Sequence, residues 1–298
     1  MAQLIGDESR TASAWQVATG LEAGAPVERR GVGRRPGLAL AVGWVGFLVL
    51  VALLAPLVAP YDPIRQDLSN AITGPSLHHL LGTDEYGRDV LSRLVWGIRP
   101  ALLGVLVAIA TASVIGLPWG LVSGYAGGRA DLVLMRVADA LLVLPALVIA
   151  LAITTALGAN LTNAMLAVGI VFSPIVARVL RSGVLTVRDR EYVTVTRLYG
   201  LPARHRMLGH VLPNALAPAL VQVTLLAGIA FLAQAALGFL GIGVQPPSPS
   251  WGDSLSSAYK FISVAPAMTF APGVTIVLTV LAVYRIGDAL RDRLEIGA

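Results

Sequence analysis

The 298-residue chain contains no cysteine, and lysine occurs once, as Lys260. Without cysteine the chain forms neither disulfides nor zinc–thiolate sites, and thiol catalysis is excluded. Lys260 follows Tyr259, so no Gly-Lys-Ser/Thr sequence completes a phosphate-binding loop of the Walker A type. The sequence also lacks a His-Glu-x-x-His zinc motif and a Gly-x-Ser-x-Gly nucleophile elbow. We therefore predict that the chain is not an enzyme, hydrolyses no ATP by that route and holds no metal.

Charged residues are scarce as well, at 13% of the chain, whereas 56% of the residues are hydrophobic and the mean hydropathy is +0.75. A soluble domain carries a much larger charged fraction, so most of this chain is expected to lie in a lipid bilayer. The net charge of +5 does not indicate nucleic-acid binding, because the positive residues are spread between the apolar runs.

The apolar runs predict an all-α integral membrane protein. A helix needs about 20 apolar residues to cross the hydrocarbon layer. Six runs come close to that length, so we expect about six transmembrane helices. They cover residues 38–59, 101–125, 132–157, 161–180, 215–241 and 268–286.

Arginine gives this set an orientation, because loops on the cytoplasmic side are enriched in arginine and lysine. With the N-terminus inside, the inside loops hold most of the arginines that lie between the runs. Both termini are therefore predicted to be cytoplasmic, in the cytoplasmic membrane. The polar tail 1–36 ends in several arginines, and the run after it exceeds the roughly 7–15 residues of a secretory signal core, so we expect it to be retained.

These features predict a division of the chain into five parts. They are a cytoplasmic tail (1–36), a first transmembrane helix (37–60), an extracytoplasmic segment with a short amphipathic helix (61–100), a five-span domain (101–290) with a cytoplasmic loop at 188–213, and a cytoplasmic C-terminus (291–298).

The amphipathic helix after the first span is expected to lie on the membrane or on the bundle. Asp84 can pair with Arg88, and Asp89 with Arg93, both at i,i+4 spacing. Thr83 or Asp84 would serve as the N-cap. A structural interfacial helix is the simpler interpretation, and a ligand site is the alternative.

Polar residues inside the apolar runs are candidates for a translocation pathway, since burying a charge in lipid is costly. Asp139 lies in the third run, with Arg136 one turn earlier as a possible partner. Gln222 and Gln234 lie in the fifth run. The alternative for all three is helix-to-helix hydrogen bonding or a simple ion pair.

The loop from 191 to 213 is the longest charged interruption in the second half of the chain. Tyr192, Val195 and Tyr199 fall on one face of a predicted helix that begins at Glu191, and Gly200 is a suitable C-terminal stop. A second short helix is expected over 203–211. A rigid helix with an exposed aromatic stripe is suited to fill a groove in a partner.

At these residues the chain resembles the C-type permease subunit of bacterial dipeptide, oligopeptide and nickel ABC importers. The resemblance covers nearly everything after residue 37. The motifs that carry it are LGTDEYGRDVLSRL (81–94), SGYAGGRADLVLMRVADALL (123–142), REYVTVTRLYG (190–200), HVLPNALAP (210–218), LGFLGIGVQPPSPSWGDSL (237–255) and GDALRD (287–292).

The resemblance implies a type I ABC importer transmembrane domain whose coupling loop docks on an ATPase subunit. The residues that it assigns to this contact are Glu191, Tyr192, Thr194, Val195, Thr196, Tyr199, Gly200 and Arg204. The family's Glu-Ala-Ala positions are occupied by Thr194, Val195 and Thr196, so a salt bridge from position 194 is not expected. Where the family often has an acidic residue in the fifth span, this chain has Gln234.

The resemblance also implies a heterodimer with a second permease subunit in the lipid bilayer. Cytoplasmic ATPase subunits would bind ATP and magnesium, an extracytoplasmic solute-binding protein would deliver the solute, and this chain would hold no cofactor and bind no nucleic acid. Peptides are the expected solute and nickel or a nickel chelate is the alternative. An ion-coupled secondary carrier is the alternative from another class, with Asp139 as its candidate ionisable group.

Overall fold

The computed structural model describes residues 36–296, and within that range every regular element is a helix. In chain order the helices are α2 (Pro36–Leu53), α3 (Ala55–Val58), the 3₁₀ turn η1 (Leu68–Asn70), α4 (Val90–Trp96), α5 (Ile98–Ala126), α6 (Gly128–Val143), α7 (Ala146–Leu157), α8 (Leu161–Arg188), α9 (Glu191–Leu198), α10 (Ala203–Arg206), the π-helical turn η2 (Met207–Val211), α11 (Leu212–Phe239), α12 (Trp251–Ala258), the 3₁₀ turn η3 (Tyr259–Phe261) and α13 (Pro266–Ile296).

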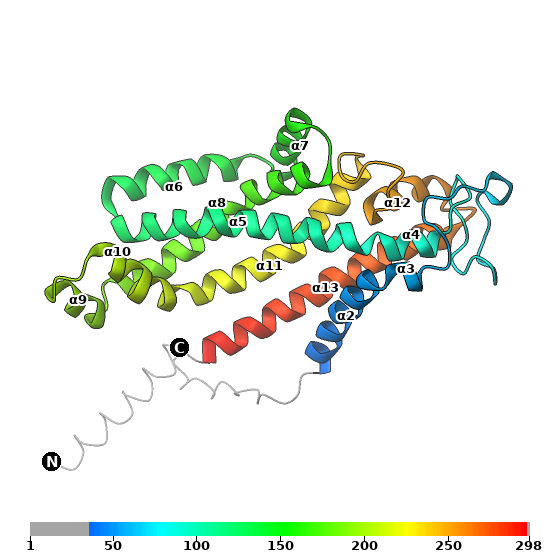
Figure 1. The fold of residues 1–298 in the computed structure, drawn as a ribbon. Helices are drawn as coiled ribbons and strands as arrows, with labels where there is room; N and C mark the ends of the chain where they lie inside the picture. Colours follow the sequence, from blue (N-terminus) through cyan, green and yellow to red (C-terminus); the bar gives the residue numbers. More distant parts are fainter. Residues whose placement is uncertain (1–35, 297–298) are drawn as a thin grey trace, which may run out of the picture. The chain divides into compact units, whose positions relative to one another are not determined.

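Helices α5, α8 and α11 run side by side through the middle of the described part (Figure 1). Glycines on α5 let it approach α8 closely, as small residues do in membrane helix pairs. A Cβ added to Gly116 would lie 2.6 Å from the Ser173 carbonyl oxygen, and one added to Gly124 would lie 2.8 Å from the Val184 Cβ. At these two glycines α5 therefore lies directly against the backbone or the Cβ atoms of α8, and a larger side chain would not fit.

The all-α membrane class is confirmed, and an apolar helix or helix pair lies at each predicted run. In residues 36–296, four helices are long and apolar enough to cross a bilayer, or five if one bent pair counts as a span. The first predicted span is a shorter apolar helix, α2, which ends at Leu53. Leu54 interrupts the helical conformation, and the short helix α3, with Pro56 in its first turn, follows it. Of the six predicted spans, four are therefore single long helices, one is a bent pair and the first is a shorter apolar helix.

The third predicted span is broken. Helices α6 and α7 meet at an angle of 91° instead of forming one straight helix over 132–157. Pro145 explains the break, because a proline drives the residue before it out of the helical region, and Leu144 is extended at φ −82° and ψ 142°. Residues 128–157 therefore form two separate helices, α6 and α7, joined at Leu144 and Pro145.

The short helix after the first span also differs from its prediction. Helix α4 does not lie on the membrane surface by itself but continues into α5, so that residues 90–126 form one long helical segment. Its N-cap is Asp89, whose carboxylate accepts hydrogen bonds from Ser92 N and Oγ, each at 2.7 Å. The predicted caps, Thr83 and Asp84, lie in the preceding turn.

Buried ion pairs hold this end of the bundle together. Arg88 pairs with Asp84 at 2.7 Å, as the spacing predicted, and both side chains are almost fully buried. Arg93 was expected to pair with Asp89, but it contacts Asp84 at 3.6 Å and Asp253 of α12 at 3.2 Å. Burial raises the pKa of the Asp253 carboxyl, and the Arg93 charge opposes that rise. The cluster therefore ties the segment before α4 to α12.

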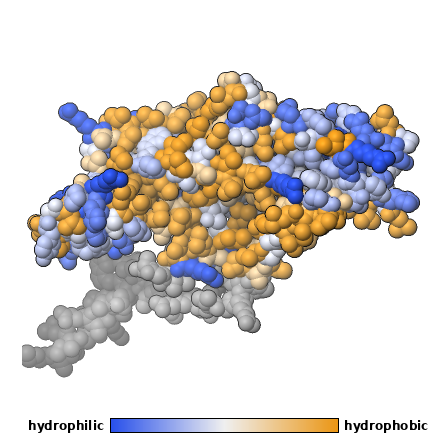
Figure 2. Space-filling model, in the orientation of Figure 1, coloured by the Kyte–Doolittle hydropathy of each residue, from blue (hydrophilic) through white to orange (hydrophobic). Residues whose placement is uncertain are grey.

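The two ends of the bundle carry different segments. Helices α9 and α10 lie at one end, whereas α12 and the segment before α4 lie at the other (Figure 1). Hydrophilic residues gather at both ends of the visible face, and hydrophobic residues cover much of the middle (Figure 2). If the apolar middle lies in a bilayer, the two segments are on opposite sides of the membrane.

Candidate functional site

Helix α9 follows α8 after a turn of two residues. Asp189 is the C-cap of α8, and Arg190, in an extended conformation at φ −67° and ψ 149°, precedes the first turn of α9. The Arg190 N–H donates to the Val187 carbonyl at 3.1 Å, which closes the turn. Glu191 stands in the first turn of α9, where a negative charge is favoured by the helix dipole. Helix α9 is therefore joined to α8 by a short, hydrogen-bonded link.

The inner face of α9 is anchored on the bundle. Val193 is only 2% exposed and belongs to a buried apolar cluster. The other buried members of that cluster come from α5, α8, η2 and α11, and they are Leu121, Leu180, Val184, Val187, Val211, Ala215 and Ala219. Burying a valine side chain contributes roughly 1.5–3 kcal/mol, so this contact fixes which face of α9 points outward.

The outer face of α9 is apolar and exposed. Tyr192 and Val195 are each about half exposed, while Leu198 and Tyr199 are 82% and 80% exposed. The expected face of Tyr192, Val195 and Tyr199 is therefore open, and the structure adds Leu198, one turn after Val195. The same spacing in the sequence could have identified Leu198. These four side chains are called the α9 surface below.

The two threonines of α9 do not extend this surface. The Thr194 hydroxyl donates to the Arg190 carbonyl at 3.3 Å, and the Thr196 hydroxyl donates to the Val193 carbonyl at 2.6 Å. Both hydroxyls thus satisfy their own helix backbone, a common arrangement for threonine within a helix. The surface that α9 offers is mostly apolar and aromatic.

A tight turn ends α9. Gly200 has a φ of +73°, a conformation that glycine adopts without strain. Its N–H donates to the Arg197 carbonyl at 3.0 Å, and the Leu201 N–H donates to the Thr196 carbonyl at 3.2 Å, which together form a Schellman motif. Pro202 then precedes α10, on which Arg204 is exposed.

The second predicted helix of this loop is not separate. After α10 the chain forms the five-residue π-helical turn η2 and passes directly into α11, so residues 203–239 make one helical segment. Pro213 lies in the first turn of α11 without a break before it. The loop is therefore one short helix, one turn and the projecting start of a long helix.

The three pathway candidates do not come together in the structure. Asp139 lies on α6 and pairs with Arg178 of α8 at 2.6 Å, not with Arg136 as expected. Gln222 and Gln234 are both on α11, separated by about 18 Å along the helix axis at the usual rise. No single binding site contains all three residues.

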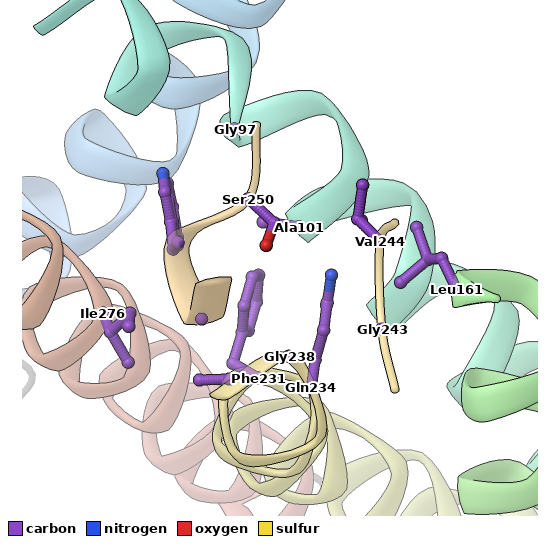
Figure 3. A pocket seen from close by; sticks show the side chains of 13 residues that line it. Gly97, Ala101, Leu161, Phe231, Gln234, Gly238, Gly243, Val244, Ser250 and Ile276 are labelled. Atoms are coloured by element: carbon purple, nitrogen blue, oxygen red, sulfur yellow. The ribbon is translucent and has the colours of Figure 1, made fainter. Parts of the chain in front are cut away.

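Gln234 lines a small cavity between α5, α11 and α12. Its Nε2 donates to the Pro100 carbonyl at 2.8 Å, and its side chain points towards α5 (Figure 3). Its Oε1 is buried and has no protein partner. The cavity measures about 20 Å³ by the positions open to a water centre, which is enough for one water. Gln234 therefore links α11 to α5 through a hydrogen bond beside a cavity of the size of one water molecule.

These features define a class of protein: a helical, multi-pass membrane protein with an anchored apolar helix projecting at one end. The family of inner membrane components of binding-protein-dependent transport systems matches residues 116–296, and the N-terminal transmembrane domain of oligopeptide transport permease C matches residues 34–78.

Characterised relatives agree with these two matches. The di/tripeptide transport system permease protein of Pseudomonas aeruginosa is 45% identical over 264 residues, covering 86% of this chain and 87% of the relative. The dipeptide transport system permease protein of Escherichia coli K12 is 41% identical over 268 residues, covering 88% and 89%. The chain therefore belongs to the family of inner membrane components of binding-protein-dependent transport systems, and it is a multi-pass inner-membrane protein.

A solved structure shares the fold. A chain of the MetNI methionine ABC transporter in an inward-facing conformation matches 68% of this chain and 96% of its own length, with a TM-score of 0.57 and 19% identity. The fold is thus that of an ABC importer's transmembrane subunit, and the expected type I importer fold is confirmed.

Proposed function

We propose that this chain is one of two permease subunits of an ATP-driven importer and that it moves peptides across the cytoplasmic membrane. The observation that carries the proposal is the α9 surface, because an apolar helix face at the polar end of the bundle requires a partner. The family membership supports an ATPase as that partner.

The α9 surface would dock in a groove of a cytoplasmic ATPase subunit that binds ATP and magnesium. Aromatic and aliphatic side chains would supply the contact, and Glu191, Thr194, Thr196, Gly200 and Arg204 would frame it. Closure of the ATPase pair would push α9, and the anchored Val193 would carry that push to the bundle as a rigid-body movement.

The remaining partners follow from the same assignment. A second permease subunit would complete the translocation path, and an extracytoplasmic solute-binding protein would dock near α12. With α9 on the cytoplasmic side, the N-terminal tail and the end of α13 also lie in the cytoplasm. Asp139, Gln222 and Gln234 keep the role of pathway candidates in this proposal, at separate places.

Peptides are the proposed solute because the relatives given above are named for dipeptide and tripeptide transport. Nickel, the alternative, receives no support from those names. Among the described residues there is no group of three or more histidine, aspartate or glutamate side chains that could hold a metal ion.

The test is a double variant, Leu198→Ala with Tyr199→Ala, in the purified importer complex. Each side chain is more than three-quarters exposed in this chain, so burial at an interface would contribute roughly 1.5–3 kcal/mol per residue. Since about 1.4 kcal/mol is a tenfold change in affinity, we expect ATPase binding to weaken by at least about 100-fold. Co-purification of the ATPase and dipeptide uptake into proteoliposomes report the effect.

The matched control is Leu77→Ala, which removes a 96% exposed leucine side chain from the segment before α4. This variant should retain the ATPase. If the double variant binds the ATPase and imports dipeptide as well as the Leu77→Ala control does, the α9 surface is not the docking site.

A further inference from the structure

One face of α8 carries a regular series of exposed polar side chains. Arg178, Ser182 and Thr186 follow one another at intervals of four residues, and all three are exposed; Arg190, just beyond the end of α8, is exposed as well. Residues four apart lie above one another on a helix, so the three residues of α8 form one continuous stripe. We call it the α8 stripe. Of the other polar residues on this half of α8, Arg181 pairs with Asp131 of α6 and Arg188 donates to the Gly124 carbonyl, whereas the Thr186 hydroxyl of the stripe donates to the Ser182 carbonyl within α8 itself.

The α8 stripe forms one wall of a hollow between α8 and α11. The hollow has a volume of about 460 Å³, and Asn214 and Pro218 line it from α11. The two helices approach closely at its floor, where a Cβ added to Gly183 would lie 2.7 Å from the Ala215 carbonyl oxygen. The Asn214 Nδ2 donates to the His210 carbonyl at 2.7 Å, so its Oδ1 remains available to a ligand.

The depth of the stripe in the membrane follows from the length of α8. Its 28 residues span about 42 Å, which is about 12 Å more than the hydrocarbon layer. Arg178 lies about 15 Å from the cytoplasmic end of α8 along the axis. Even if all of the excess length protruded into the cytoplasm, Arg178 would still lie within the hydrocarbon layer.

Arg178 and its partner Asp139 are each about half exposed although they lie at this depth. Facing lipid would be costly for such an ion pair, so exposed intramembrane charges normally face water or another protein. The pair therefore indicates that the face formed by α6 and α8 near Arg178 is turned away from the acyl chains.

We propose that the α8 stripe and the facing residues of α11 form the cytoplasmic half of the water-filled path along which the peptide leaves the importer. The proposal rests on the proposed function, with the second permease subunit closing the opposite side. The chemistry suits a zwitterionic peptide: hydroxyl groups and the Asn214 Oδ1 replace water at the peptide backbone. Arg178, which lines the hollow, offers a positive charge complementary to the carboxylate end, while its partner Asp139 lies on α6 outside the hollow. Because α8 leads directly into α9, ATPase closure would move this wall.

Single cysteines test the inference, because the chain has none of its own. Ser182→Cys and Thr186→Cys place a thiol on the stripe, and Leu281→Cys on the exposed apolar face of α13 is the lipid-facing control. The intact importer complex in lipid nanodiscs is treated with a charged, membrane-impermeant maleimide. Only a thiol in contact with water ionises and reacts, so we expect stripe labelling at least about tenfold faster than control labelling. Labelling after denaturation normalises each variant.

Dipeptide uptake is then measured in proteoliposomes after labelling. We expect stripe-labelled complexes to lose uptake while retaining ATP hydrolysis. Stripe labelling as slow as that of Leu281→Cys would overturn the inference, and so would fast labelling that leaves uptake intact. If the unmodified complex imports no dipeptide, the proposed function fails, and the labelling contrast then decides by itself whether the stripe faces water.

Discussion

Replacing Gly116 by alanine should destabilise the protein, although alanine is the better helix former. The added Cβ would lie 2.6 Å from the Ser173 carbonyl oxygen and 2.7 Å from the Val176 Cβ. To restore a normal contact of 3.4 Å, α5 and α8 must separate locally by about 0.8 Å, and a gap of that size forfeits a quarter to a half of the dispersion energy of the atoms involved. Overpacking of this kind costs about 1–3 kcal/mol.

The matched control is Gly46→Ala in α2, where nothing lies within 4 Å of the added Cβ. There the helix propensity of alanine should act alone and stabilise by up to about 1 kcal/mol. The apparent Tm of the detergent-purified complex measures both variants, and a loss of 1 kcal/mol corresponds to roughly 2–4 °C in a chain of this size. An equal or higher Tm for Gly116→Ala than for Gly46→Ala would refute the close-packing argument.

Two further predictions concern the two ends of the bundle. Asp84→Asn should lower the apparent Tm strongly, by the equivalent of about 3–5 kcal/mol, because it leaves two buried arginines without their shared carboxylate. Asp253→Asn should cost about 1 kcal/mol or less, since its carboxylate is partly exposed and Arg93 keeps Asp84 as a second partner; equal losses for the two variants would contradict this argument. Gly200→Pro should reduce dipeptide uptake at least about tenfold while ATP hydrolysis continues, because proline cannot adopt a φ of +73°. Unchanged uptake would show that the turn after α9 does not transmit movement.

Much of the loop between α8 and α11 could be predicted from its sequence. The spacing of Tyr192, Val195 and Tyr199 placed these side chains on one face, and Gly200 marked the end of the helix, because both depend on local backbone geometry. The anchoring of Val193 could not be predicted in the same way. It depends on a cluster assembled from α5, α8 and α11, which are distant in sequence.

Ion pairing separates local from long-range information in the same manner. The Asp84–Arg88 pair was predictable, since i,i+4 neighbours meet on a single turn of chain. Arg136, one turn earlier on the helix, was a possible partner for Asp139, but Asp139 pairs with Arg178 on α8. Arg93 likewise pairs with Asp253, 160 residues away. Spacing along the sequence identifies possible ion-pair partners, but the packing of the helices determines which of them meet.

The sequence by itself determined the membrane class, the helical fold and the family resemblance, because hydropathy, proline and glycine positions and short motifs are properties of local chain segments. Only the tertiary structure decided that the third apolar run is bent by 91° and that the pathway candidates lie apart. It also decided that the polar residues of α8 share a hollow with α11. These features depend on which helix faces pack together, and that choice is made by contacts between distant segments of the chain.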